Sequence, residues 1–239
     1  MRMQLHLRLK SDATFGRGDG VAGLVDEEVE HDEYGLPYLR GRTLKGLLVE
    51  ECANILFALE QANLPVAKQH ELKEAAQYLF GRAGSTLSDD AMTHFGAARL
   101  PDDLREALIA DVETYEQSKG GLSSMEILES LTAIRRQTAV DAQTDAPEKG
   151  SLRSMRVLLH ETSLVAEVDL DDDESRRGQR ETALALLAAC VLGLRRAGTG
   201  RNRGRGRLAA SLYDAKEQDV TGAHFERFKE LVCGERAER

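Results

Sequence analysis

The sequence predicts an α+β fold, with a ferredoxin-like (RRM-like) core of the order βαββαβ and a helical insertion. Several short segments alternate apolar and polar residues as strands do, and two long segments repeat apolar residues at helical spacing. These segments follow one another in the order of that fold. The chain has 239 residues, 41% of them hydrophobic, so it is large enough to bury a core.

The first strand and the first helix have the clearest patterns. Met3, Leu5, Leu7 and Leu9 recur at every second position, which predicts a half-buried strand. A glycine-rich loop follows at 15–23, and an extended, partly hairpin-like segment is expected over 26–38. Thr43 is expected to cap a helix. The apolar residues on one face of this helix are Leu44, Leu47, Leu48, Cys52, Ile55, Leu56 and Leu59.

A helix-rich region then interrupts the core, and we expect an insertion here. It has a candidate strand at 92–99 and amphipathic runs at 102–116 and 124–133. The remaining core elements are expected to be a β-hairpin of residues 153–160 and 163–170 with its turn at Glu161 and Thr162, a second long helix at 178–194 and a last strand at 207–213.

Charge and cysteine content limit the functional classes. The net charge of −9 means that the molecule as a whole repels nucleic acid, so any such binding must use a local basic patch. Cys52, Cys190 and Cys233 are widely spaced without a C-x-x-C pair, which argues against a zinc site or a disulfide framework. No long apolar span is present, and we expect a cytoplasmic protein that does not enter a membrane.

Such a basic patch stands at 193–208, GLRRAGTGRNRGRGRL, here called the arginine loop. It contains six arginines and five glycines and no acidic residue. Arginine grips phosphate through a planar fork, and glycine lets the main chain approach a ligand closely. Arg/Gly runs also occur in disordered tails. This one, however, lies between a helical and a strand-like segment, which favours an ordered loop that binds a polyanion.

Two other nucleotide-related signals are weak. Gly18, Gly20 and Gly23 satisfy G-x-G-x-x-G, but the dinucleotide fingerprint needs a helix to open there, and VDEEVEHDEYG follows instead. The aromatic RNA-binding signature of RRM proteins is also absent, and the predicted strands carry few rings. Bound RNA is therefore expected to be held through its backbone.

Three segments resemble one protein family. YGLPYLRGRTLKGLL (34–48) resembles the RAMP superfamily segment in which a Gly-aliphatic-Pro-Tyr sequence leads into the first helix. The arginine loop is similar to the C-terminal glycine-rich loop of that superfamily. Residues 135–158 resemble the thumb of the backbone subunits in type III CRISPR effector complexes. The three matches stand in the order that the family has.

This resemblance implies a backbone subunit that binds CRISPR guide RNA along its sugar-phosphate backbone, without reading its sequence. The implied partners are guide RNA, target RNA, other effector subunits and further copies of the chain along the guide. It also implies a RAMP core of residues 1–60 and 150–239, and a helical insertion with a thumb-like hairpin at 61–149.

The candidate RNA-binding residues lie in two segments. Arg42 and Lys45 stand at the start of the first predicted helix, where free N–H groups and the helix dipole favour an anion. Arg40 flanks them. An exposed first-turn lysine without a ligand is the alternative for Lys45. The arginine loop supplies the other candidates: Arg195, Arg196, Arg201, Arg203 and Arg205.

Asp26 is the candidate catalytic and metal-binding residue. In family members that cleave target RNA, an aspartate precedes the Gly-x-Pro-Tyr segment, and Asp26 stands one residue short of that distance, which leaves Glu27 and Glu28 as alternatives. Such a carboxylate would hold Mg²⁺ or another divalent cation against the scissile phosphate, or orient the 2′-hydroxyl. The resemblance thus implies a metal-dependent endoribonuclease acting on target RNA, with catalysis left open.

Other functions of this acidic segment also stay open. The run DEEVEHDE (26–33) fits a solvated loop. His31 is a candidate general base, as in RAMP enzymes that process guide precursors, although a lone histidine in such a run is typical of a surface. The alternatives to a target-cleaving subunit are therefore a non-catalytic scaffold or capping subunit and a guide-processing endoribonuclease.

Overall fold

The main sheet has four antiparallel strands in the order β2-β5-β1-β6. A computed structural model of the protein describes residues 1–81, 91–118, 120–139, 141, 143–171, 174 and 177–234. The sheet consists of β1 (Arg2–Leu9), β2 (Thr93–Phe95), β5 (Ser163–Leu170) and β6 (Leu208–Tyr213). With α1 between β1 and β2, and α5 between β5 and β6, this is the βαββαβ arrangement, and the predicted α+β ferredoxin-like class is confirmed.

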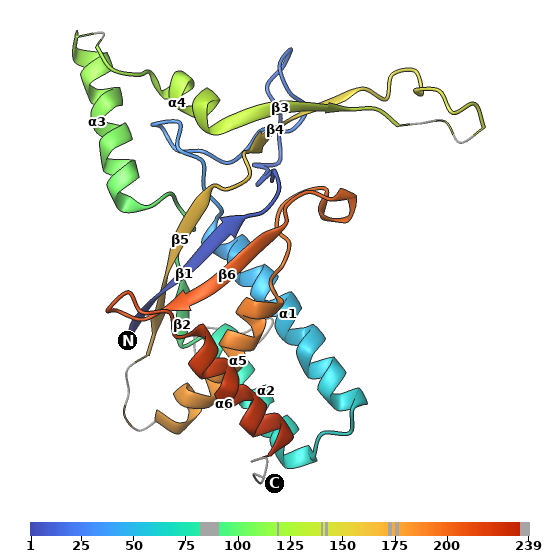
Figure 1. The fold of residues 1–239 in the computed structure, drawn as a ribbon, viewed down its shortest axis with the longest axis vertical. Coiled ribbons are helices and arrows are strands. Elements are labelled where there is room, and N and C mark those ends of the chain that lie inside the picture. Colours follow the sequence, from blue (N-terminus) through green and yellow to red (C-terminus); the bar gives the residue numbers. More distant parts are fainter. Residues whose placement is uncertain are drawn as a thin grey trace.

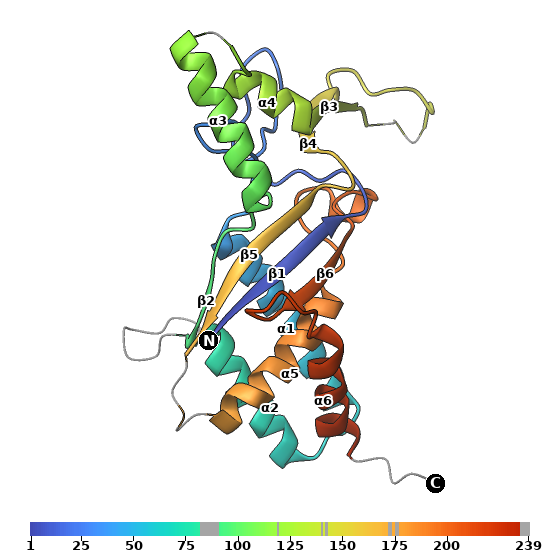
Figure 2. The ribbon, with the colours of Figure 1, turned by 60° about the vertical axis from the view of Figure 1, so that its left-hand side comes forward.

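Helices cover one face of this sheet (Figures 1 and 2). They are α1 (Gly41–Gln61), α2 (Val66–Phe80), α5 (Arg177–Gly193) and α6 (Thr221–Cys233). α5 packs against the other three, and every residue from Thr182 to Val191 is buried. β1 supplies the facing apolar layer, because Met3, Leu5, Leu7 and Leu9 are at most 1% exposed. Within the described residues, none of the helices combines the length and apolar character needed to cross a membrane.

The other end of the molecule holds two helices and a second sheet (Figure 1). α3 (Asp102–Ser118) leads to α4 (Ser124–Leu131), which begins with a capping box of Ser123 and Glu126. β3 (Thr132–Gln137) and β4 (Arg153–Leu158) then pair antiparallel. They form the expected thumb-like hairpin, here called the thumb hairpin, which projects from the body.

The predicted hairpin of residues 153–160 and 163–170 is wrong. Both strands exist, but β4 pairs with β3 while β5 pairs with β1 and β2. Alternation in the sequence identifies a strand without identifying its partner. The second strand of the ferredoxin-like core is β2, whose three residues are too few to show a periodic pattern.

The predicted cap of the first helix is also wrong. α1 begins at Gly41, two residues before Thr43, and the N-cap position belongs to Arg40. A Cβ atom on Gly41 would lie 2.3 Å from the Phe95 carbonyl oxygen of β2. Glycine therefore lets the start of α1 lie directly against the sheet backbone.

α2 packs in the main body, although its residues fall in the predicted insertion. Leu72, Ala75 and Leu79 are buried in the same core as β1 and α5, and α2 contacts α5 and α1. How the chain divides into folding units stays a prediction.

Candidate nucleic-acid interface

The arginine loop is an ordered hairpin-like excursion between α5 and β6. Its stem is a bridge between Arg196 and Arg207, and the Ala197 N–H donates to the Gly206 carbonyl at 2.9 Å. At its tip, Arg201–Arg203 form one turn of 3-10 helix. Gly200 and Gly204 flank this turn with φ of 72° and 81°, in the left-handed region that other residues avoid. The glycines thus shape the turn that presents the arginines.

Two further glycines permit close backbone packing in the loop. A Cβ on Gly198 would lie 2.4 Å from the Thr14 carbonyl oxygen, and one on Gly206 would lie 1.9 Å from that of Ala197. The Thr199 N–H also donates to the Thr14 carbonyl at 2.9 Å. The loop is therefore pressed onto the segment that follows β1.

The arginine loop also contacts α1. Arg201 Nη1 lies 2.9 Å from Glu50 Oε2. Arg42, Gly46 and Glu50 are all exposed and stand four residues apart, so they share one face of α1. Lys45 lies beside them, half-buried. Arg201 therefore contacts the face of α1 that also carries Arg42, about two turns after Arg42.

The three predicted cations of the first segment differ in their surroundings. Arg40 is paired with the buried Glu30, at 2.6 Å from Nη2 to Oε1, which also accepts from the Tyr38 hydroxyl at 3.0 Å. This carboxylate raises the pKa of Arg40. For Arg42 and Lys45 the described part of the chain contains no ion pair. Arg42 and Lys45 are therefore better placed than Arg40 to bind a phosphate.

A basic cleft lies between the arginine loop and the thumb hairpin. One hollow of about 440 Å³ lies between Arg201, Arg203, Arg205 and the strand residue Met155. The Arg205 guanidinium contacts the Met155 sulfur. A neighbouring hollow of about 520 Å³ continues along the thumb, and its basic lining residues are Arg203, Arg153 and Lys149. Arg203 and Gln137 border both hollows, and the acidic residues on their linings are Glu27 and Glu148.

A smaller hollow lies on the other side of the same loop. Its 380 Å³ are bordered by Lys10, Arg135, His160 and Arg205 around Asp12. Arg135 Nε lies 2.9 Å from the Asp12 carboxylate, which partly neutralises this group of cations. The predicted Arg195 and Arg196 are exposed near the stem, and Arg196 Nη1 donates to the Arg201 carbonyl at 2.9 Å.

Asp26 is exposed and is attached to the thumb hairpin. Its Oδ2 accepts from the Ser154 N–H at 2.6 Å and from the Ser154 hydroxyl at 3.2 Å. The backbone hydrogen bond from Ser154, then its hydroxyl and the nearby Arg153 charge, lower the pKa of Asp26 below its ordinary value of 3.8. The carboxylate is thus ionised and held near the first residue of β4.

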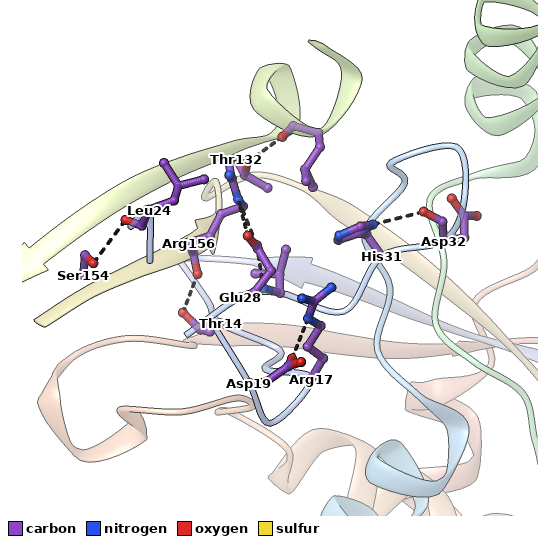
Figure 3. Close-up of polar contacts among 12 residues, drawn as sticks. Thr14, Arg17, Asp19, Leu24, Glu28, His31, Asp32, Thr132, Ser154 and Arg156 are labelled. Atoms are coloured by element: carbon purple, nitrogen blue, oxygen red, sulfur yellow. Dashed lines mark hydrogen bonds and ion pairs between the residues drawn. The ribbon is translucent and has the colours of Figure 1, made fainter. Parts of the chain in front are cut away.

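The alternatives to Asp26 have different surroundings. Glu28 is buried in an ion pair with Arg156, with 2.8 Å between Oε1 and Nε, so its carboxylate has no access to RNA. Glu27 borders the cleft and accepts from the Thr199 hydroxyl at 2.9 Å. His31 Nδ1 lies 3.0 Å from the Asp32 carbonyl oxygen. Figure 3 shows His31 apart from Ser154, on the far side of the Glu28–Arg156 pair.

The carboxylates near the cleft provide few metal ligands. Within the described residues no group of three His, Cys, Asp or Glu side chains is arranged to hold a metal ion. Mg²⁺ is commonly held by one or two carboxylates together with substrate phosphates and water. A divalent cation at Asp26 stays a prediction.

The open face of the sheet has a mixed charge. Its ring pair is His6 stacked on Tyr213, with centroids 4.1 Å apart. The hollow there, of about 790 Å³, is bordered by the acidic residues Asp102, Asp103, Glu167 and Glu217 and by Arg99 and Arg105. This face is therefore less basic than the surface around the arginine loop.

The thumb hairpin and the end of β1 add four cations to this surface that were not among the predicted RNA-binding residues. They are Lys10, Arg135, Lys149 and Arg153. Their signal was present, since three of them lie in the thumb-like segment 135–158. The pairing of β3 with β4 and their position beside the arginine loop were needed to relate them to it.

Comparisons with known proteins agree with this fold. A chain of the type III-B Cmr-β complex bound to cognate target RNA has a TM-score of 0.58 and 13% identity, over 89% of this chain and 97% of that chain. A chain of the apo Cmr-β complex has a TM-score of 0.57 and 12% identity, over 90% and 98%. A chain of a type IV-B CRISPR complex has a TM-score of 0.53 and 13% identity, over 91% and 92%.

At identities this low, the structural similarity establishes a shared fold and no more. No curated protein matches the chain. The family is established separately, because the model of the RAMP superfamily matches residues 6–209, which is most of the sequence. The protein therefore belongs to the RAMP superfamily.

Proposed function

We propose that the chain is a guide-RNA-binding backbone subunit of a type III CRISPR effector complex. The observation that carries this proposal is that the arginine loop contacts two other elements with exposed cations, α1 and the thumb hairpin. Arg201 joins the loop to α1 through Glu50, and Arg205 joins it to β4 through Met155. Membership of the RAMP superfamily and the fold shared with chains of CRISPR complexes support the same function.

This surface is suited to a sugar-phosphate backbone. Arginine forks bind phosphate bidentately, and the glycines at 200 and 204 leave the main chain of the turn accessible. Neither feature reads base edges, so one subunit can hold guides of any sequence. The acidic surplus of the chain is concentrated elsewhere; α3, for example, carries six acidic residues and one arginine. We assign these acidic surfaces to solvent and to other subunits, including further copies of this chain along the guide.

The RNA that copurifies with the native complex tests this function. We expect short, uniform RNAs derived from CRISPR repeats and spacers. An RNA-free monomer that ignores guide RNA even with its partner subunits present would contradict the proposal.

As a second step of the same function, we propose that Asp26 takes part in cleaving the paired target RNA. Its support is an ionised, exposed carboxylate that Ser154 holds near Arg153, one of the residues that line the basic cleft. A divalent cation bound there would neutralise charge on the scissile phosphate. Asp26 would supply one ligand to it, while Arg153 and Arg203 would hold neighbouring phosphates.

One observation favours the competing scaffold function. Ser154 donates two hydrogen bonds to the same Asp26 oxygen, as it would to an aspartate that only anchors the loop. Cleavage by the assembled complex separates these functions, because a scaffold leaves target RNA intact at the positions that this subunit faces. For guide processing the described residues offer no supporting contact, since the His31 contact that they contain is with the backbone carbonyl group of Asp32.

A further inference from the structure

The most deeply buried ion pair in the described part of the chain joins Glu28 to Arg156. Their side chains are 2% and 3% exposed, and Arg156 Nε lies 2.8 Å and 3.1 Å from the two carboxylate oxygens. Arg156 Nη1 also donates to the Thr132 hydroxyl of β3 at 3.2 Å, and its carbonyl accepts from the Thr14 hydroxyl at 2.9 Å. Figure 3 shows these contacts converging from three segments. The pair lies below the surface that would bind RNA, so it has no direct role in binding.

This pair adjoins a short parallel strand addition. Residues 26–28 run along the edge of β4 that β3 leaves free, with Glu27 opposite Met155 in a parallel bridge. The Asp26 N–H donates to the Ser154 carbonyl at 2.8 Å, and the Arg156 N–H donates to the Glu27 carbonyl at 2.9 Å. Side chains alternate along such a segment, so Asp26 and Glu28 point the same way while Glu27 points to the arginine loop.

A shift of this segment by one residue would reverse that arrangement. Asp26 would lose Ser154, and Glu27 would leave Thr199. The Glu27 N–H also lies 3.3 Å from the Ser154 carbonyl oxygen. Three backbone hydrogen bonds alone define the register weakly, because a shifted segment can form equivalent ones. A buried charge pair defines it strongly, since any other register leaves a buried arginine without its carboxylate.

Stability alone does not account for a charged pair at this position. The free-energy cost of removing two charges from water offsets most of their mutual attraction. Apolar residues of similar volume often stabilise a core equally well. What apolar residues lack is directional pairing.

We propose that the Glu28–Arg156 pair is a positioning device that sets the register of residues 26–28 on β4 and thereby places the Asp26 carboxylate against Ser154. The importance of that placement for cleavage rests on the proposed function. The effect of the pair on the register does not depend on that function. Glu28 and Arg156 are positioning residues in this scheme and contact no RNA.

The test replaces the pair by apolar side chains in the full chain, as Glu28→Met with Arg156→Met. Site-resolved amide hydrogen exchange should show the Asp26 and Arg156 amides losing protection by about tenfold or more, with the amides of β1 and β5 unchanged. In the assembled complex, guide and target binding should stay within about twofold while target cleavage falls by about tenfold or more. The matched control removes an exposed pair of the same net charge, Arg2→Met with Asp169→Met, and should change none of these values.

Arg156→Lys supplies a second, conservative variant, which also serves if the apolar pair does not fold. Lysine keeps the charge but lacks the fork that reaches both Glu28 and Thr132, so protection at the two amides should be intermediate. Full protection of both amides in the apolar variant would overturn the proposal. If the wild-type complex never cuts RNA, the cleavage proposal fails, and the exchange data still decide whether the pair sets the register.

Discussion

Arg201 of the arginine loop and Glu50 of α1 form an ion pair, with 2.9 Å between Nη1 and Oε2 and about half of each side chain exposed. The pair joins two of the basic elements that we assign to guide RNA. It also places a carboxylate where a phosphate would bind. Glu50 is therefore a competitor of RNA for Arg201.

Glu50→Gln should tighten guide binding by about twofold to fivefold, because an exposed ion pair is worth about 0.2–1 kcal/mol. Fluorescence anisotropy with a labelled guide at low salt measures this change. Asp103→Asn, on α3 away from the loop, is the control with the same change of net charge. Equal tightening in both variants would mean that overall charge, and not competition for Arg201, is responsible.

Replacing Arg201, Arg203 and Arg205 together by alanine should weaken guide binding to a similar extent for every spacer sequence. The salt dependence should flatten by about 0.7 in log–log slope for each phosphate of the single strand that the variant no longer binds. Binding isotherms over a salt series with several spacers test this. The control is the triple alanine variant of Arg2, Arg227 and Lys229, which removes three exposed charges elsewhere. A weakening that depends on spacer sequence would contradict backbone recognition.

Asp26→Ala should abolish cleavage of target RNA at the sites facing this subunit and leave guide and target binding nearly unchanged. Wild-type cleavage should require a divalent cation and stop with EDTA. Gel assays of the assembled complex measure both. Undiminished, metal-dependent cleavage by the variant would transfer the assignment to Glu27, since Glu28 is buried. Cleavage that persists in EDTA would favour His31.

The lowered pKa of Asp26 predicts how its contribution to stability depends on pH. A carboxyl group whose pKa is lower in the folded state contributes stability above its unfolded pKa, and that contribution is lost as the pH falls through the folded pKa. The difference in thermal midpoint between wild type and Asp26→Asn should thus be constant from about pH 7 to 5 and shrink below about pH 4. A difference that stays constant down to about pH 2 would show that the Ser154 hydrogen bonds do not depend on the charge.

Two glycines of the arginine loop should differ in their tolerance of a side chain. Both have positive φ, which costs alanine about 1–2 kcal/mol. A Cβ on Gly204 meets no atom within 4 Å, whereas one on Gly206 would lie 1.9 Å from the Ala197 carbonyl oxygen. Gly206→Ala should therefore lower the free energy of unfolding by about 3 kcal/mol or more, and Gly204→Ala by about 1 kcal/mol. Urea unfolding measures both, and equal decreases would contradict the packing at Gly206.

Local patterns in the sequence predicted much of the fold. Met3, Leu5, Leu7 and Leu9 indicated β1, and the apolar faces of α1 and α5 indicated two helices, because burial imposes a period that can be read within one segment. The resemblance to RAMP proteins added the thumb hairpin. The arginine loop was visible for a similar reason, since its composition departs so far from that of the rest of the chain.

Contacts between distant segments were decided by the tertiary structure. β4 pairs with β3 and with residues 26–28 instead of with β5, which alternation alone does not determine. Glu28 and Asp26 are near neighbours in one acidic run, yet one is buried against Arg156 and the other is exposed on Ser154. The sequence by itself determined which segments form strands and helices and where cations gather, because those properties are local. Only the folded chain determined which of these carboxylates is buried and which is exposed, because that depends on the register between segments more than a hundred residues apart.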